Sequence, residues 1–204
     1  MIASPPGAPS RNLLKHTSGN PVQRWLLDRF HATVADLVRE TLPTGGSVLD
    51  VGCGEGFAAA YLAERVPGLR ITGLDASALA LRFADRQLGS GRVAQADAAW
   101  LPIADRSVDL AIALEVLEHL PMPEQTLREL RRVSRGPVIV STPNQPFFAA
   151  ANLARLKNLP TWGDDPEHVQ WWTVQGFTRL VGAYLRVERV ALRFPWTIVL
   201  ARHA

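Results

Sequence analysis

The sequence predicts an α/β protein built on a largely parallel sheet, and three observations carry this prediction. An apolar run at Val48–Val51 leads into a glycine-rich turn and then into a helical pattern. Apolar runs and amphipathic stretches then alternate along the chain, which is typical of strand–helix units in a sheet covered on both faces. Two of these runs end in acidic residues, Asp75 and Asp97. Because open α/β sheets bind ligands beyond the carboxyl ends of their strands, we expect a ligand site there.

The composition is that of one ordinary globular domain. The chain has 204 residues, of which 47% are hydrophobic and 20% charged, enough for one sizeable core. The net charge is only +3 and the basic residues are scattered, so charge alone does not predict a nucleic-acid partner. Cys53 is the only cysteine, which excludes an internal disulfide. The first residues lack a secretory pattern and no apolar run approaches the ~20 residues of a membrane span, so we expect a cytoplasmic protein.

The region before the first strand divides into a tail and a helix. Residues 1–12 are rich in proline and are expected to be disordered, which leaves residues 13–204 as a single domain. Apolar residues recur at helical spacing over 22–42, with Asn20 as a candidate cap and Pro21 at the first helical position. We therefore expect a long amphipathic helix that packs beside the first strand.

The glycine-rich turn contains Gly52, Gly54 and Gly56. Glycine suits a turn where a ligand packs against bare backbone and where a positive φ is often needed. The spacing is Gly-x-Gly-x-Gly, which differs from the Gly-x-Gly-x-x-Gly turn that binds a dinucleotide pyrophosphate. Asp50 before the turn and Glu55 within it add negative charge where a phosphate would be repelled. The turn therefore favours a ligand that carries positive charge.

The acids after the second and third strands predict the contacts of a nucleoside. Asp75 lies 19 residues beyond Gly56, close to the ~20 expected for a carboxylate that accepts hydrogen bonds from ribose hydroxyls. The alternative is that Asp75 only forms the turn before a helix capped by Ser77. The third strand, expected over 91–97, ends in a further acid, Asp97.

Residues 48–56 resemble the first motif of the class I S-adenosylmethionine-dependent methyltransferases. That cofactor has a sulfonium and an ammonium but no phosphate, in agreement with the charges around the turn. Residues 101–109 also resemble the approach to the fourth strand in this family. Two closing strands, expected over 184–194 and 196–202, match its reversed last strand. The resemblance covers the chain from about Ser47 and implies a seven-stranded Rossmann-like sheet, order 3-2-1-4-5-7-6, with an antiparallel last strand and helices on both faces.

The resemblance also implies which residues bind the cofactor. Asp97 would accept a hydrogen bond from the adenine amino group, and Ala98 would offer its backbone amide to the ring. In this family the segment before the first strand often covers the acceptor site, so residues 13–45 are a candidate lid; the alternative is a helix that only closes the core. The full cofactor-binding set comprises Asp50, Gly52, Gly54, Asp75, Ala76, Asp97, Ala98, Leu114 and Glu115.

Candidate catalytic residues follow the fourth strand. If residues 115–120 are helical, Glu115, Glu118 and His119 lie at i, i+3 and i+4 and share one face. His119 and His168 are the best candidates for a general base, which is needed only if the acceptor must lose a proton. A lone histidine is more often structural, so that interpretation stays open for each of them.

Residues 144–172 form an insertion after the fifth strand that is rich in aromatic side chains. Such side chains above the carboxyl edge of the sheet suggest a partly apolar acceptor pocket. The alternative is that they only fold the insertion onto the core. The aromatic residues concerned are Phe147, Phe148, Trp162, Trp171 and Trp172.

Several hypotheses remain open for the identity of the methyl acceptor and for metal dependence. Glu115, Glu118, His119 and His168 resemble the ligand set of metal-dependent O-methyltransferases, both of ubiquinone biosynthesis and of the terminal 2′-hydroxyl of small RNAs. The same Glu-Val-Leu-Glu-His string recurs in metal-free relatives that act on small molecules, so a divalent metal is possible but not expected. No dense basic tract is present, which makes RNA a less expected acceptor than a small molecule. We expect O-methylation by in-line methyl transfer, with a non-catalytic cofactor-binding partner subunit as a further alternative.

Overall fold

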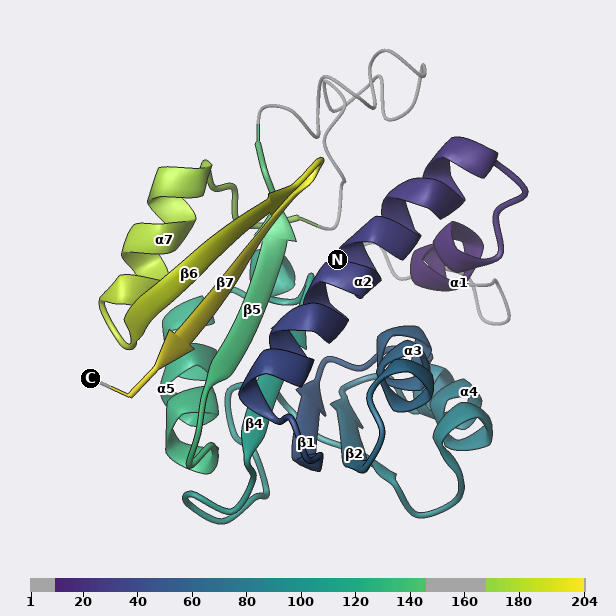
Figure 1. Ribbon diagram of the computed structural model, residues 1–204, viewed down its shortest axis with the longest axis horizontal. Helices are drawn as coiled ribbons and strands as arrows, with labels where there is room; N and C mark the ends of the chain where they lie inside the picture. The colour runs from purple at the N-terminus through teal and green to yellow at the C-terminus, as the bar shows by residue number, and fades with distance from the viewer. Residues whose placement is uncertain (1–9, 146–167, 204) are drawn as a thin grey trace.

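The computed structural model describes residues 10–145 and 168–203 and shows one seven-stranded sheet in the order β3-β2-β1-β4-β5-β7-β6 (Figure 1). The first five strands pair in parallel, whereas β7 runs antiparallel to both β5 and β6. This arrangement confirms the expected fold class and strand order. The strands are β1 (Gly46–Val51), β2 (Leu69–Asp75), β3 (Val93–Gln95), β4 (Leu110–Leu114), β5 (Val138–Pro143), β6 (Arg186–Arg193) and β7 (Trp196–Arg202).

Helices cover both faces of the sheet (Figure 1). Alternate residues of β1 point to opposite faces, so that Val48 packs into a core with α2 and α3 while Leu49 packs into a core with α5 and α7. The central strands are therefore buried on both sides. The helices are α1 (Arg11–His16), α2 (Pro21–Thr41), α3 (Phe57–Arg65), α4 (Ala78–Leu88), the 3-10 turn η1 (Leu117–His119), α5 (Pro123–Val133) and α7 (Val174–Gly182).

Local signals in the sequence set several helix starts as expected. The Asn20 side chain accepts hydrogen bonds from the amides of Val22 and Gln23, at 2.9 and 3.2 Å, and so caps α2. Ser77 caps α4 in the same way, and Thr173 caps α7. Because these caps satisfy amides that the helix leaves unpaired, they fix where each helix begins.

Three expected boundaries were wrong. Helix α1 begins at Arg11, so residues 11 and 12 belong to a helix and not to the expected tail; residues 1–9 of that tail lie outside the described residues. The third strand extends only over Val93–Gln95, because only these residues pair with β2. The segment after β4 forms a single 3-10 turn, and not the helix over 115–120 on which the shared face of Glu115, Glu118 and His119 depended. Within the described ranges, no helix combines the length and the apolar character needed to cross a membrane.

Candidate functional site

A cavity of about 220 Å³ lies at the carboxyl edge of the sheet, among the ends of β1, β2 and β4 and the loop after β3. It brings together acidic and small residues that are distant in the sequence. Seven of the residues singled out from the sequence line it. They are Gly52, Asp75, Ala76, Asp97, Ala98, Glu115 and His119.

Three of the expected cofactor residues, Asp50, Gly54 and Leu114, do not line this cavity. Asp50 is buried in β1, with only 2% of its surface exposed. Burial, and secondarily the charge of Asp75, raises the pKa of Asp50 to about 7. Its Oδ2 has no hydrogen-bond partner among the described residues. A cation placed nearby would favour the ionised form of this carboxyl group.

The glycine turn brings the main chain close to its neighbours. Gly52 has a φ of +72°, and a Cβ at this position would lie 2.4 Å from the Cγ2 of Val116, so a larger residue would displace the segment after β4. The Gly54 amide donates a 2.8 Å hydrogen bond to Oδ2 of Asp75. The turn is thereby attached to the end of β2.

Asp75 is held in a fixed orientation. Besides the Gly54 amide at Oδ2, the Ser77 amide donates a 2.7 Å hydrogen bond to Oδ1. Each carboxylate oxygen can accept about two hydrogen bonds, so each keeps one acceptor position. Asp75 lines the cavity and can therefore bind two neighbouring hydroxyl groups of a ligand.

The loop after β3 forms one wall of the cavity, and side chains of α5 hold this loop in place. Glu129 accepts a 2.8 Å hydrogen bond from the amide of Leu101, a lining residue, while Arg132 donates to the carbonyls of Leu101 and Ile103 at 3.0 and 2.7 Å. Arg132 also forms ion pairs with Glu129 and Asp105, each at 2.7 Å. Sequence reasoning missed this role, because Arg132 lies on the polar face of an amphipathic helix and its contacts with Leu101, Ile103 and Asp105 are long-range.

The expectation that Glu115 shares a helical face with Glu118 and His119 was wrong. Glu115 has a φ of +57°, which turns the chain out of β4, and only Leu117–His119 form a helical turn. The Glu115 carboxylate forms an ion pair with Lys15 of α1. Glu115 therefore lines the cavity, and it is not a member of the cluster formed by Glu118, His119 and His168.

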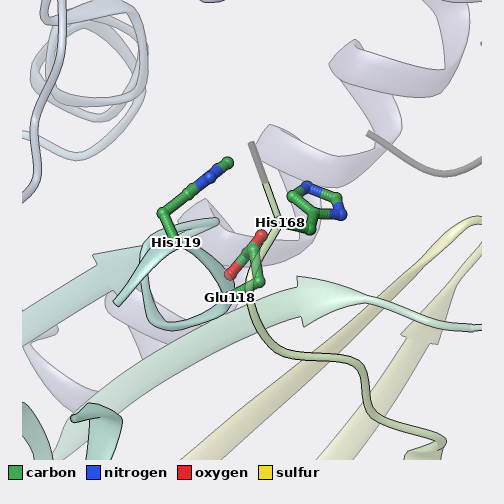
Figure 2. A group of neighbouring side chains, drawn as sticks. All are labelled: Glu118, His119 and His168. Carbon is green, nitrogen blue, oxygen red and sulfur yellow. The ribbon is translucent and has the colours of Figure 1, made fainter. Parts of the chain in front are cut away.

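Glu118, His119 and His168 do come together (Figure 2). One ligand atom from each residue lies within 4.8 Å of the others, and the two imidazole rings are 4.9 Å apart between centroids. Figure 2 shows the Glu118 carboxylate between the two rings. The amides of Val169 and Gln170 donate to the main-chain carbonyl of Glu118, at 2.9 and 3.1 Å, which places His168 beside η1.

Glu118 is 1% exposed, and neither of its carboxylate oxygens makes a hydrogen bond of ordinary geometry to a described residue. Burial, and then the charge of Glu115, raises the pKa of Glu118 well above its usual value. His119 is exposed and lines the cavity, whereas His168 is 9% exposed. The cluster thus joins a buried acid to a histidine that faces the ligand site.

Helix α1 adds contacts that sequence reasoning missed. Glu55 was expected to place its charge toward the ligand, but its carboxylate accepts hydrogen bonds from Ser10 and Asn12 instead. His16 stacks on Phe57 with ring centroids 4.3 Å apart and lies 5.3 Å from His31. Burial lowers the pKa of His16 to about 3 and of His31 to about 4, so both imidazoles are neutral at physiological pH. The expected aromatic residues Phe147, Phe148 and Trp162 lie outside the described residues.

The charges lining the cavity fit S-adenosylmethionine better than a dinucleotide. Its acids are Asp75, Asp97 and Glu115, and within the described residues no lysine or arginine lines it. Carboxylates can accept hydrogen bonds from ribose hydroxyls and amino groups and attract a cationic ligand, but they repel a pyrophosphate. The donor set is therefore suited to a cofactor that has a ribose, an amine and a sulfonium but no phosphate.

Residues 49–139 match a protein-family model described as a methyltransferase domain. This stretch runs from β1 to β5 and includes every residue that lines the cavity. Together with the sheet order and the glycine turn, the match identifies residues 49–139 as a methyltransferase domain of the class I type.

Curated relatives agree with this domain match. An uncharacterised methyltransferase of Mycobacterium sp. (strain JLS) is 39% identical over 113 residues, which is 54% of this chain and 44% of the relative. A trans-aconitate 2-methyltransferase of Azoarcus sp. (strain BH72) is 42% identical over 106 residues, 52% of this chain and 41% of the relative. The chain therefore matches less than half the length of these relatives.

A solved structure shows the same fold over nearly the whole chain. It is a magnesium protoporphyrin IX methyltransferase from Synechocystis PCC 6803 with bound S-adenosylhomocysteine. The TM-score is 0.70 at 20% sequence identity, and the match covers 93% of this chain and 91% of that chain. At this identity the comparison supports the fold.

Proposed function

We propose that the protein is an S-adenosylmethionine-dependent methyltransferase that acts on a small molecule, most readily on an oxygen atom. The observation that carries this proposal is one cavity that joins Asp75, Asp97 and Glu115, from three adjoining segments of the sheet edge, to His119. The relative named as a trans-aconitate 2-methyltransferase supports an acceptor of small size.

Each acid has a distinct role in binding the cofactor. Asp75 accepts hydrogen bonds from both ribose hydroxyls through the acceptor position that each oxygen keeps. Asp97 accepts a hydrogen bond from the adenine amino group, and Ala98 offers its amide to the ring. Glu115 attracts the ammonium group, while Gly52, Gly54, Ala76 and Leu114 shape the surrounding backbone and Asp50 places negative charge beneath it. The cofactor itself supplies a methyl group that its positive sulfonium makes ready to transfer.

The chain contributes positioning and proton transfer. Holding the acceptor in line with the methyl group can supply several kcal/mol of the barrier, as is typical of well-oriented reactants. His119 lines the cavity and would take a proton from an acceptor hydroxyl, with His168 as a second candidate. Residues 13–45 would cover the site, and residues 144–172 would form a partly apolar acceptor pocket.

A second candidate is a metal-dependent O-methyltransferase, and the arrangement of Glu118, His119 and His168 favours it. A buried carboxylate without an ordinary hydrogen bond, flanked by two imidazoles, is a suitable ligand set for a divalent transition ion. Glu115, the fourth expected ligand, pairs with Lys15 instead. A bound ion would lower the pKa of an acceptor hydroxyl and make a separate base unnecessary.

The acceptor class can be tested by methyl transfer from S-adenosylmethionine labelled in its methyl group. The full chain is incubated with small-molecule, lipid and RNA fractions of the source cell, and the label is followed in each. We expect label in a small-molecule fraction. Label in RNA alone would favour the metal-dependent 2′-hydroxyl reaction, whereas cofactor binding without transfer to any fraction would identify a non-catalytic partner subunit.

A further inference from the structure

The exposed apolar side chains of the protein gather at one end of the sheet, which we call the ligand edge. At this edge the five parallel strands have their carboxyl ends, and the cavity lies there. Among the described residues, ten large apolar side chains are more than half exposed, with exposed fractions from 51% to 69%. All ten belong to segments at the ligand edge, and six of them are Trp25, Trp100, Met122, Trp171, Leu192 and Phe194.

Two of these side chains flank the cavity. Trp100 directly precedes the lining residue Leu101, and Met122 lies two residues after the lining residue Leu120. Both are exposed, and Trp100 is the most exposed of the ten. The rim of the cavity therefore carries apolar side chains on two segments that are distant in the sequence.

The β6–β7 hairpin and the start of α2 bring further apolar side chains to the same edge. Trp196, the first residue of β7, pairs with Pro143, the last residue of β5, so the turn that carries Phe194 lies at the carboxyl end of β5. Figure 1 shows this turn and the first turns of α2, which carry Trp25, at the end of the molecule to which the β5 arrow points.

The opposite edge of the sheet is polar. Within residues 10–145 and 168–203, no large apolar side chain is exposed there. Its exposed surface carries ion pairs, such as Arg39 with Asp36 near the end of α2 at 2.8 Å and Arg135 with Asp109 at 2.6 Å. Single exposed apolar residues are normally scattered over a protein surface. Their restriction to one edge indicates that this edge meets an apolar partner.

The arrangement fits a lipid surface better than a second protein. The apolar side chains come from separate helices, loops and a hairpin, and they surround the cavity singly or in pairs. A protein partner needs a continuous complementary patch of about 800 Å² on each side. Lipids rearrange around separate side chains, and tryptophan, which supplies three of the ten, favours the boundary between headgroups and acyl chains.

Positive charge accompanies the apolar side chains on α2. The Arg29 guanidinium lies over the Trp25 ring, 4.7 Å from its centroid, and Arg24 is exposed beside them. Asp28, the only acid in the first three turns of this helix, accepts a 3.1 Å hydrogen bond from the Tyr61 hydroxyl. The start of α2 therefore combines an exposed aromatic ring with two cations, which is complementary to anionic lipid headgroups.

We propose that the ligand edge docks on an anionic lipid surface. The exposed aromatic and aliphatic side chains enter the headgroup region, and Arg24 and Arg29 contact lipid phosphates. The cavity then lies on the side of the protein that faces the lipid. This docking goes beyond the proposed function and needs no cofactor.

Cosedimentation of the full chain with vesicles of equal parts phosphatidylglycerol and phosphatidylcholine measures the docking. We expect the unaltered protein to bind, and the triple variant Trp100→Ser/Met122→Ser/Leu192→Ser to bind at least about tenfold more weakly, because less apolar surface leaves water. Vesicles with brominated acyl chains should quench the tryptophan fluorescence of the unaltered protein, which shows that side chains enter the bilayer.

The charge contribution is measured on the same helix. Arg24→Ala/Arg29→Ala should weaken vesicle binding about threefold to tenfold, and this effect should disappear at high salt. Arg39→Ala is the matched control, since Arg39 is exposed near the far end of α2. It should bind vesicles as the unaltered protein does.

Two vesicle results would overturn the docking: no binding of the unaltered protein, or equal binding of the triple variant. Sedimentation velocity without lipid examines the other occupant. A dimer that the triple variant abolishes would show that a second copy covers the ligand edge, and it would also overturn the proposal. Thermal melts confirm that the variants fold, and Trp100→Ser alone, at the most exposed position, replaces the triple variant if that variant does not.

Vesicle binding and cofactor binding are measured separately, so the two proposals can fail independently. Calorimetry with S-adenosylhomocysteine reports on the proposed function and contains no lipid. A protein that binds S-adenosylhomocysteine but no vesicles refutes the docking and leaves the cofactor assignment in place.

Discussion

The main-chain amide of Gly54 donates a 2.8 Å hydrogen bond to Oδ2 of Asp75 and so joins the glycine turn after β1 to the end of β2. These two features were recognised separately in the sequence, one as a ligand turn and the other as a ribose-binding acid. The structure shows that they form one unit. The orientation of the Asp75 carboxylate and the shape of the turn therefore depend on each other.

Asp75→Ala should weaken S-adenosylhomocysteine binding about 30- to 1000-fold. The reason is the loss of charge-assisted hydrogen bonds to two ribose hydroxyls, which together contribute about 2–4 kcal/mol. Titration calorimetry measures this change. Asp85→Ala on α4 is a matched control, since Asp85 accepts from Ser90 and Gly91 away from the cavity. An unchanged Kd in Asp75→Ala would show that Asp75 does not bind the cofactor.

Asp50 should make stability depend on pH between about 4 and 7. Burial raises its pKa from 3.8 to about 7, so over this range the folded state keeps a proton that the unfolded chain has lost. The protonated Asp50 carboxyl group therefore stabilises the folded state at low pH. This contribution to the free energy of unfolding, up to about 4 kcal/mol, is lost as the pH rises through the pKa of Asp50 in the folded state.

Asp50→Asn tests this dependence because it keeps the shape of the side chain and removes the titration. Urea unfolding at pH 4.5 and pH 7.5 should show a larger fall in stability for the unaltered protein than for the variant. Parallel pH profiles for the two proteins would mean that Asp50 does not titrate in this range.

Methyl transfer should persist in EDTA if His119 or His168 acts as the base. We also expect His168→Ala and Glu118→Gln to reduce transfer while S-adenosylhomocysteine affinity is kept, because neither residue lines the cavity. The measurement is the initial rate of labelled methyl transfer. Loss of activity in EDTA with recovery in Mn²⁺ would instead establish the metal-dependent reaction at Glu118, His119 and His168.

Arg132→Ala should weaken cofactor binding several-fold through the loop that it holds. It removes hydrogen bonds to the carbonyls of Leu101 and Ile103 and the ion pair with Glu129, and we expect a stability loss of about 1–3 kcal/mol. Calorimetry and urea unfolding measure the two effects. Arg131→Ala, an exposed arginine on the same helix, is the control. Equal affinities in the two variants would exclude a positioning role for Arg132.

The parts of the site that the sequence predicts are those set by spacing along one strand–turn–helix unit. Gly52, Asp75 and Asp97 follow strands whose apolar patterns are plain, and parallel strands bring their carboxyl ends to one edge. The same reasoning predicted the helix caps, whereas the sheet order was implied by the resemblance to the methyltransferase family. The local sequence pattern is sufficient for these features, because the residues that form the pattern and the turn or cap that they produce lie within a few positions of each other.

The parts of the site that the sequence did not predict depend on contacts between distant segments of the chain. The positive φ of Glu115 takes this residue out of the helical turn that holds Glu118 and His119, and no property of a glutamate in the sequence predicts that conformation. The direction of the Glu55 carboxylate depends on Ser10 and Asn12, more than 40 residues earlier in the chain. Spacing identifies which residues lie at the ligand edge, but packing decides which way each side chain points.

The most direct test of the central claim is a competition experiment with labelled S-adenosylmethionine bound to the full chain. The acids that line the cavity accommodate a cationic cofactor and repel a pyrophosphate, so unlabelled S-adenosylhomocysteine should displace the label while NAD and NADP should not. Displacement by NAD at concentrations comparable to those of S-adenosylhomocysteine, or no binding of the label, would contradict the assignment of this cavity as a methyltransferase cofactor site.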